Sequence, residues 1–145
     1  MNIIVSACLL GINCKYNGGN NYSKILERLK EKHHLIPVCP ESYGGLPTPR
    51  NPAEQKEGRI FLSDGTDVTE EFFKGARKMM QIVDYFDCEV AILKENSPSC
   101  GNGRIYDGTF TGTLTDGSGI FAQMLNEKGI RILGETEIEE ISKLL

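Results

Sequence analysis

The sequence predicts an α/β protein in which helices cover both faces of a small parallel sheet. Four short apolar runs, at 2–7, 35–38, 90–93 and 130–133, have the character of buried strands. Helical patterns separate these runs, and strands that alternate with helices form parallel sheets with right-handed crossovers. The chain has 145 residues, of which 39% are hydrophobic and 25% charged, so we expect one globular domain over 1–145.

One proline predicts the order of the strands. Pro37 lies in the second apolar run and has no backbone N–H to donate to a sheet ladder, which places that strand at an edge. We therefore expect a three-layer, Rossmann-like fold of about four strands in the order 2-1-3-4. The first and third strands then flank the switch point, where such sheets bind ligands beyond the carboxyl ends of their strands.

The remaining elements are expected from caps and turns. Ser23 and Thr69 are candidate N-caps, and Gly129 stands where a glycine ends a helix. Turn residues at 63–66 predict a hairpin between short strands, and 104–110 predicts a small β-hairpin excursion. The expected helices cover 23–32, 70–86, 118–128 and 136–145, and two loops without a hydrophobic period cover 9–20 and 39–50.

Composition excludes several classes of function. A formal net charge of -4 disfavours stable binding to nucleic acid or to an anionic membrane. No apolar run approaches the roughly 20 residues that span a bilayer. The first five residues lack the basic region of a signal peptide, so a cytoplasmic protein is expected. The glycine-rich segments match neither a dinucleotide fingerprint nor a P-loop, which leaves a nucleotide cofactor weakly supported.

The chain carries five cysteines, an odd number that suits metal binding or catalysis better than a disulfide framework in a reducing compartment. No CxxC pair is present, and the closest spacing is Cys8 to Cys14. A zinc ribbon and a thioredoxin-type motif are therefore disfavoured. His33 and His34 precede the second strand, at the wrong edge to complete a zinc site, and are expected to be solvated.

Three cysteines are expected to meet at one end of the sheet. Cys8, Cys39 and Cys100 each follow a predicted strand, and neighbouring strands lie only about 5 Å apart. Soft thiolate ligands favour zinc or an iron–sulfur cluster, and three ligands would leave one iron of a cubane open. Cys14 is the rival fourth ligand and would close the site. Cys88, at the opposite edge of the sheet, is expected to be a packing residue.

Polar residues near these thiols have two interpretations each. Glu41, two residues after Cys39, is either a general acid/base beside a metal or a loop-capping or solvated residue. Ser97 and Ser99 lie in the loop SPSCG at 97–101 and either donate to a ligand or satisfy the turn. Arg50 either binds a carboxylate or phosphate or forms a structural salt bridge.

Five motifs occur together and point to one family. They are VSACLLG at 5–11 with Cys14, CPE at 39–41 with GGLPTPR at 44–50, GTDVT at 65–69, Lys94 with SPSCG at 97–101, and IYDG at 105–108. In this combination the chain resembles the thiouracil desulfidases, small bacterial domains long catalogued as of unknown function. The resemblance covers almost the whole sequence.

The resemblance implies non-redox desulfuration of a thiolated uracil or a related thio-nucleobase, with release of sulfide. It implies a 4Fe–4S cluster held by Cys8, Cys39 and Cys100, whose free iron takes up the sulfur. Cys14 would then belong to the site loop without being a ligand.

The resemblance also implies roles for polar residues. Glu41 would handle protons on water and base, and Ser97 would assist at the substrate. Further substrate contacts are expected from Ser99, Arg50 and Cys14. The chain departs from the family pattern at KYNG, 15–18, where arginine and aspartate are usual, which puts in doubt any role of that loop in substrate binding.

Two other classes of function remain open from the sequence. In the first, Cys14 completes a tetrathiolate zinc site and the protein is a structural module without catalysis. In the second, the thiols themselves handle sulfur or sense redox state, through a persulfide or disulfide at Cys8 or Cys100. Metal analysis separates both from a cluster enzyme.

Overall fold

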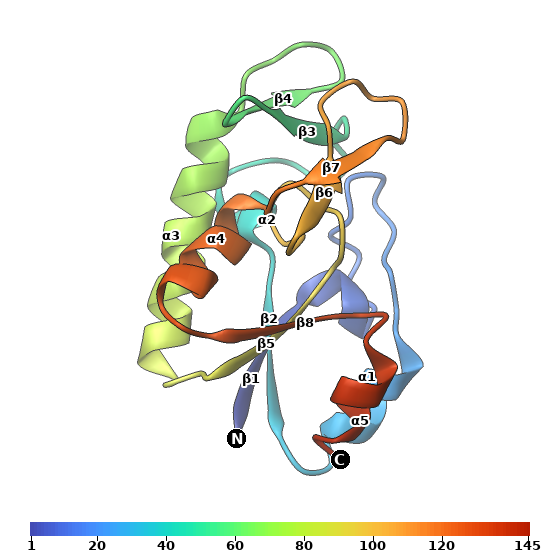
Figure 1. The fold of residues 1–145 in the computed structure, drawn as a ribbon, viewed down its shortest axis with the longest axis vertical. Coiled ribbons are helices and arrows are strands. Elements are labelled where there is room, and N and C mark those ends of the chain that lie inside the picture. The colour runs from blue at the N-terminus through green and yellow to red at the C-terminus, as the bar shows by residue number, and fades with distance from the viewer.

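A four-stranded parallel sheet forms the centre of the protein in the computed structural model, which describes residues 1–145 (Figure 1). Its strands are β1 (Asn2–Ser6), β2 (His34–Val38), β5 (Val90–Leu93) and β8 (Arg131–Gly134). They stand in the order β2-β1-β5-β8, which confirms the predicted order 2-1-3-4. Pro37 lies on the edge strand β2, opposite Val5 of β1.

Helices cover both faces of this sheet and make three layers (Figure 1). Because side chains alternate along a strand, Ile4 of β1 packs toward one face while Ile3 and Val5 pack toward the other. The first face is covered by α3 (Thr69–Tyr85) and α4 (Ile120–Glu127), and the second by α1 (Lys24–Leu29) and α5 (Ile138–Ser142). None of these helices has the length and apolar character needed to cross a bilayer.

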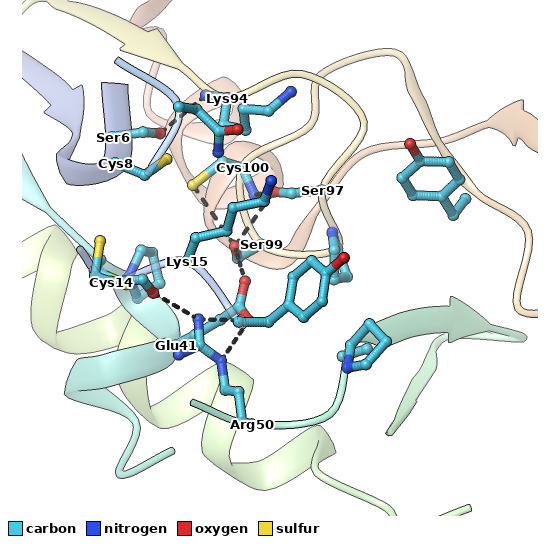
Figure 2. A pocket seen from close by; sticks show the side chains of 18 of the residues that line it. Ser6, Cys8, Cys14, Lys15, Glu41, Arg50, Lys94, Ser97, Ser99 and Cys100 are labelled. Carbon is cyan, nitrogen blue, oxygen red and sulfur yellow. Dashed lines mark hydrogen bonds and ion pairs between the residues drawn. The ribbon is translucent and has the colours of Figure 1, made fainter. Parts of the chain in front are cut away.

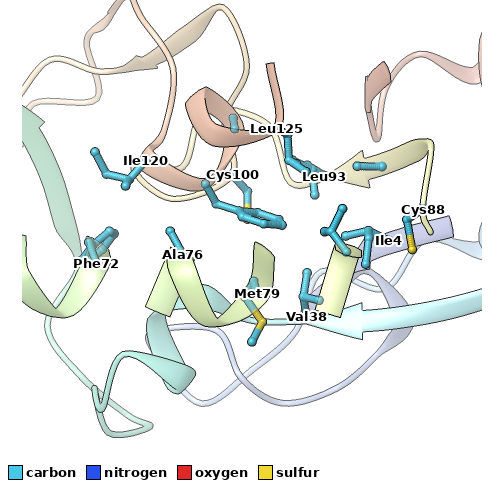
Figure 3. Packing of buried hydrophobic residues seen from close by; sticks show 14 of the residues in the cluster. Ile4, Val38, Phe72, Ala76, Met79, Cys88, Leu93, Cys100, Ile120 and Leu125 are labelled. Carbon is cyan, nitrogen blue, oxygen red and sulfur yellow. The ribbon is translucent and has the colours of Figure 1, made fainter. Parts of the chain in front are cut away.

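The larger of the two hydrophobic clusters lies between the sheet and α3. Phe72, Ala76 and Met79 of α3 are at most 1% exposed and pack with side chains from α4 and the strands (Figure 3). Cys88 belongs to the same cluster and is 4% exposed, which confirms its predicted packing role.

The start of α3 differs from the predicted cap. Val68 occupies the N-cap position, and Thr69 is already helical. The Thr69 hydroxyl instead donates to Asp67 Oδ1 at 2.6 Å and accepts the Ile60 N–H at 2.9 Å. The neighbouring strand β4 (Arg59–Leu62) therefore uses the hydroxyl that the sequence suggested for the helix end.

Two antiparallel hairpins rise beyond the carboxyl ends of the central strands (Figure 1). The strands β3 (Ala53–Lys56) and β4 (Arg59–Leu62) are joined at Glu57 and Gly58, both with positive φ, of 53° and 77°. The turn predicted at 63–66 leads only to an isolated bridge between Phe61 and Asp67. The hairpin excursion predicted over 104–110 is present as β6 (Arg104–Tyr106) and β7 (Leu114–Asp116), so it extends beyond the predicted end.

Both of the loops that lack a hydrophobic period contain a short helix. A 3₁₀ helix, η1 (Ala7–Leu10), follows β1, and α2 (Pro40–Tyr43) follows β2. A single turn is too short to show a period, which is why the sequence did not predict either helix. The backbone of α2 packs directly on α3, where Gly44 and Gly75 leave no room for a side chain.

Replacing Gly75 with alanine is expected to lower the free energy of unfolding by about 1–3 kcal/mol or more. A Cβ at this position would lie 1.7 Å from the Pro40 carbonyl oxygen and 2.8 Å from the Gly44 nitrogen, so the two helices must separate. Urea unfolding followed by circular dichroism measures the change. Lys74→Ala, at an exposed position of the same helix, is the control, and a Gly75→Ala midpoint no lower than the control's would contradict the close packing.

Candidate functional site

A cavity of about 710 Å³ lies beyond the carboxyl ends of β1, β2 and β5 (Figure 2). Four of the five cysteines line it: Cys8, Cys14, Cys39 and Cys100. The cavity therefore occupies the switch point that the strand order predicts, between the first and third strands of the parallel sheet.

Each thiol is placed by the element that follows a strand. Cys8 lies in η1, directly after β1, and Cys39 is the N-cap residue of α2, directly after β2. Cys100 follows β5 at more distance, in a turn closed by Ser97, whose hydroxyl accepts the Cys100 N–H at 2.8 Å. Figure 2 shows Cys8, Cys14 and Cys100 around the same cavity.

These thiols surround the cavity without converging on one point. No three Cys, His, Asp or Glu side chains are grouped closely enough to hold a single metal ion. His33 lies away from the cavity and its Nε2 contacts the Leu144 carbonyl oxygen at 2.6 Å, so it is half-buried where solvation was expected. His34 is exposed, as predicted.

The protein environment separates the acidities of the four thiols. A hydrogen bond from the Cys14 thiol, with further help from Ser42, lowers the pKa of Cys39 to about 6. The same hydrogen bond raises the pKa of Cys14. Burial raises the pKa of Cys8, against a hydrogen bond from Asn21, and raises the pKa of Cys100 to about 12. Cys39 is therefore the thiol that ionises first.

In the metal-free chain, Cys39 is expected to react with iodoacetamide faster than Cys8 or Cys100. The thiolate is the nucleophile, and a pKa of about 6 makes Cys39 largely ionised at neutral pH. Its rate should rise as the pH increases through about 6 and then level off. Peptide mass mapping at several pH values measures the rates, with buried Cys88 as the control. Faster labelling of Cys100 would contradict this assignment.

The carboxylate of Glu41 lies in the cavity wall, and two side chains hold it. Its Oε2 accepts a hydrogen bond from Ser99 Oγ at 2.8 Å, and its Oε1 lies 3.2 Å from Arg50 Nη2 and 3.3 Å from Nε (Figure 2). The side chains of Glu41 and Arg50 are 15% and 5% exposed. The structure therefore places the predicted carboxylate in the site with a fixed orientation.

Arg50 forms a structural salt bridge with Glu41, which is the second of the two roles that the sequence left open for it. Besides Glu41, the guanidinium donates to the Cys14 carbonyl oxygen at 3.0 Å, to the Pro47 carbonyl oxygen at 3.2 Å and to Thr48 Oγ1 at 3.0 Å. All three nitrogens thus have protein partners. Arg50 also ties the loop of Cys14 to the helix of Cys39 and Glu41.

The two serines of the loop 97–101 do different things. Ser99 is 3% exposed, and its hydroxyl donates to Glu41 while lying 3.6 Å from Cys100 Sγ. Ser97 uses its oxygen as the acceptor for the Cys100 N–H, and its nearest other partner is Ser99 Oγ at 3.4 Å. Because Ser99 gives its own proton to Glu41, Ser97 is the donor in this long contact, and a ligand in the cavity can take over that donor.

A second group of charged residues fixes the start of the Cys100 loop. Lys94 Nζ lies 2.6 Å from Glu135 Oε1, and Glu135 Oε2 accepts the Glu95 N–H at 2.6 Å. In return, Glu95 Oε2 accepts the N–H and the hydroxyl of Thr136, both at 2.6 Å. This exchange joins the ends of β5 and β8. It also leaves the Lys94 ammonium on the cavity wall, where its charge favours the Cys8 thiolate.

Glu54 and Lys15 are charged cavity residues that sequence reasoning missed and that the tertiary structure brings in. Glu54 of β3 lines the cavity although it is 8% exposed, and Lys15 points into it from the loop after η1 (Figure 2). A glutamate on the inward side of a hairpin strand is a weak signal, because β3 is short and its register depends on the turn. Lys15 lies in the segment where the family pattern is broken, so the motif did not select it.

Comparisons with known proteins agree with the resemblance seen in the sequence. The model of the family described as 2-thiouracil desulfurase matches residues 3–137. The uncharacterized protein YbbK of Bacillus subtilis strain 168 is 41% identical in an alignment 149 residues long. The alignment covers 96% of this chain and 99% of YbbK. A solved structure, the [4Fe-4S]-dependent thiouracil desulfidase TudS, superposes with a TM-score of 0.91 at 40% identity, over 97% of this chain and 95% of TudS. On this evidence the chain belongs to the 2-thiouracil desulfurase family.

Proposed function

We propose that this protein is a [4Fe-4S]-dependent desulfidase that converts thiouracil and water into uracil and hydrogen sulfide, without net oxidation or reduction. One observation carries the proposal: three thiols and a hydrogen-bonded carboxylate line one cavity at the switch point of the sheet. The similarity to TudS over 97% of the chain supports the same chemistry.

The donor set of the cavity fits an iron–sulfur cluster. Thiolates are the ligands of such clusters, and four thiols around a cavity of about 710 Å³ suit a group larger than one ion. Cys8, Cys39 and Cys100 would hold it, because they follow three neighbouring strand ends. When bound, the cluster would supply an electrophilic iron for the thiocarbonyl sulfur. Cys14 would remain a hydrogen-bond partner of Cys39.

Glu41 is the group that moves protons in this proposal. Its carboxylate would accept a proton as water attacks the ring carbon and would return it as sulfide leaves. Ser99 and Arg50 hold the two carboxylate oxygens, so the carboxylate needs no reorientation between the two transfers. Both supporting side chains are nearly buried, which keeps the orientation fixed.

Ser97 would orient the substrate. Its oxygen is engaged by the Cys100 N–H, and its proton, held only by the 3.4 Å contact with Ser99 Oγ, would donate to a polar atom of the base. The Lys94 ammonium on the same wall would offset negative charge that collects on the thiolates and the leaving sulfur. These groups bind and orient, and Glu41 performs the proton transfer.

Anaerobic purification or reconstitution, followed by metal analysis and assay, tests the proposal. About four irons and four acid-labile sulfides per chain are expected, with the broad visible absorption of an iron–sulfur cluster. The loaded protein should convert 2-thiouracil to uracil with one sulfide released for each uracil formed. One zinc per chain and no iron would favour the tetrathiolate module, and a persulfide or disulfide without metal would favour thiol chemistry.

A further inference from the structure

Glu54 holds the β6–β7 loop over the cavity. Its Oε1 accepts the N–H groups of Gly108 and Phe110, each at 3.0 Å. The loop lies directly on β3, because a Cβ at Gly108 would stand 2.6 Å from the Lys56 Cβ. Through this contact the aromatic residues Tyr106 and Phe110 become part of the cavity wall.

The second carboxylate oxygen of Glu54 has no protein partner. The hydrogen bonds and ion pairs of the chain involve Oε1 of this residue and leave Oε2 without a donor. Oε2 is not sealed inside the protein either, since Gln55 Oε1 is the only fully buried side-chain polar atom without a partner. Glu54 lines the cavity, and Oε2 is the oxygen of its carboxylate that the loop amides leave free.

A neutral side-chain acceptor such as glutamine could accept the N–H groups of Gly108 and Phe110 with a smaller desolvation penalty than a carboxylate. Burying a carboxylate is unfavourable unless its oxygens are hydrogen-bonded or paired with a cation. Glu54 is 8% exposed and has no cation partner. The hydrogen-bond donor for its Oε2 atom therefore has to come from a bound molecule. A ring N–H of a bound base is such a donor, and the aromatic residues beside it suit a flat ring.

We propose that Glu54 Oε2 accepts a hydrogen bond from a ring N–H of the substrate, while Oε1 keeps the loop of Phe110 in place. This selects planar cyclic thioamides that retain an N–H beside the thiocarbonyl. The inference rests on the proposed function for the sulfur chemistry, but base recognition is a separate property that binding alone measures. Glu54 is thus a specificity-determining residue distinct from Glu41.

Calorimetric titration of the cluster-loaded protein with uracil and with 1,3-dimethyluracil tests this inference. The dimethylated base lacks both ring N–H groups and should bind the wild-type chain about 10–100-fold more weakly, as expected for a hydrogen bond to a charged group. In Glu54→Gln, uracil should lose the same factor, so that the two bases bind nearly equally. Gln retains one oxygen for the loop amides and replaces the other with a donor.

The exposed Glu57→Gln variant in the β3–β4 turn is the matched control and should keep the wild-type preference. Hydrogen exchange at the Phe110 amide reports whether the loop stays closed in Glu54→Gln. Equal binding of both bases by the wild type, or an undiminished preference in Glu54→Gln, would overturn the inference. Sulfide release from 2-thiouracil is measured separately in the same samples. If the wild type binds uracil with the expected preference but releases no sulfide, only the proposed function is contradicted.

Discussion

Cys100→Ser is expected to lose its bound iron and its sulfide release together. Cys100 lies in a turn closed by Ser97, is 5% exposed and lines the cavity, so its thiol is held in place for a cluster. The loss should exceed the roughly 10–100-fold effect of changing a residue behind a metal ligand. Iron and sulfide content, visible absorption and 2-thiouracil turnover measure it.

Two other cysteines provide matched controls for this result. Cys88→Ala removes a buried thiol in the core and should lower stability without changing the iron content of the folded protein. Cys14→Ser removes the rival fourth ligand and should retain the cluster. If Cys14→Ser lost iron as completely as Cys100→Ser, the assignment of three ligands would be wrong and a closed four-thiolate site would be favoured.

Glu41→Gln is expected to keep the cluster and lower turnover by about 10²–10⁴-fold, the usual contribution of a positioned acid or base. Glutamine preserves the shape of the side chain, since its oxygen can accept from Arg50 while its NH2 group donates to Ser99 Oγ, but it cannot carry the proton. The KM for thiouracil should change little, because Glu41 is assigned to proton transfer and not to binding. Initial rates and the iron content of the same sample measure the effect.

Arg50→Met separates the chemistry of Glu41 from its support. This variant removes the cation beside Glu41 and the ties to the Cys14 and Pro47 carbonyls, but it leaves the carboxylate in place. We expect lower stability and a smaller loss of turnover than in Glu41→Gln. Equal losses of turnover in the two folded variants would indicate that Glu41 acts only as a partner of Arg50.

Local patterns in the sequence were sufficient for the architecture and for the thiols. The missing N–H of Pro37 placed β2 at the edge and so predicted the strand order, and the alternation of strands and helices predicted a parallel sheet. Because the carboxyl ends of parallel strands meet at one edge of a sheet, the sequence alone predicted that Cys8 and Cys39 lie beside Cys100. All three line the cavity.

Local patterns could not predict hydrogen bonds and ion pairs between side chains that lie far apart in the sequence. The pair Ser99–Glu41 spans 58 positions and the pair Lys94–Glu135 spans 41, so no local period links them. The carboxylate of Glu54 lines the cavity because β3 and β4 turn at Glu57 and Gly58, and Glu57 is an unusual residue at a turn position with positive φ.

By itself, the sequence determined the fold class, the strand order, the thiols of the cavity and the family, because these depend on local periodicity and on motifs. The tertiary structure decided how Arg50 is used, which serine supports Glu41, and which second glutamate lines the cavity. The physical reason is that hydrogen bonding in a buried site depends on distances between side chains, and only the packed chain sets those distances.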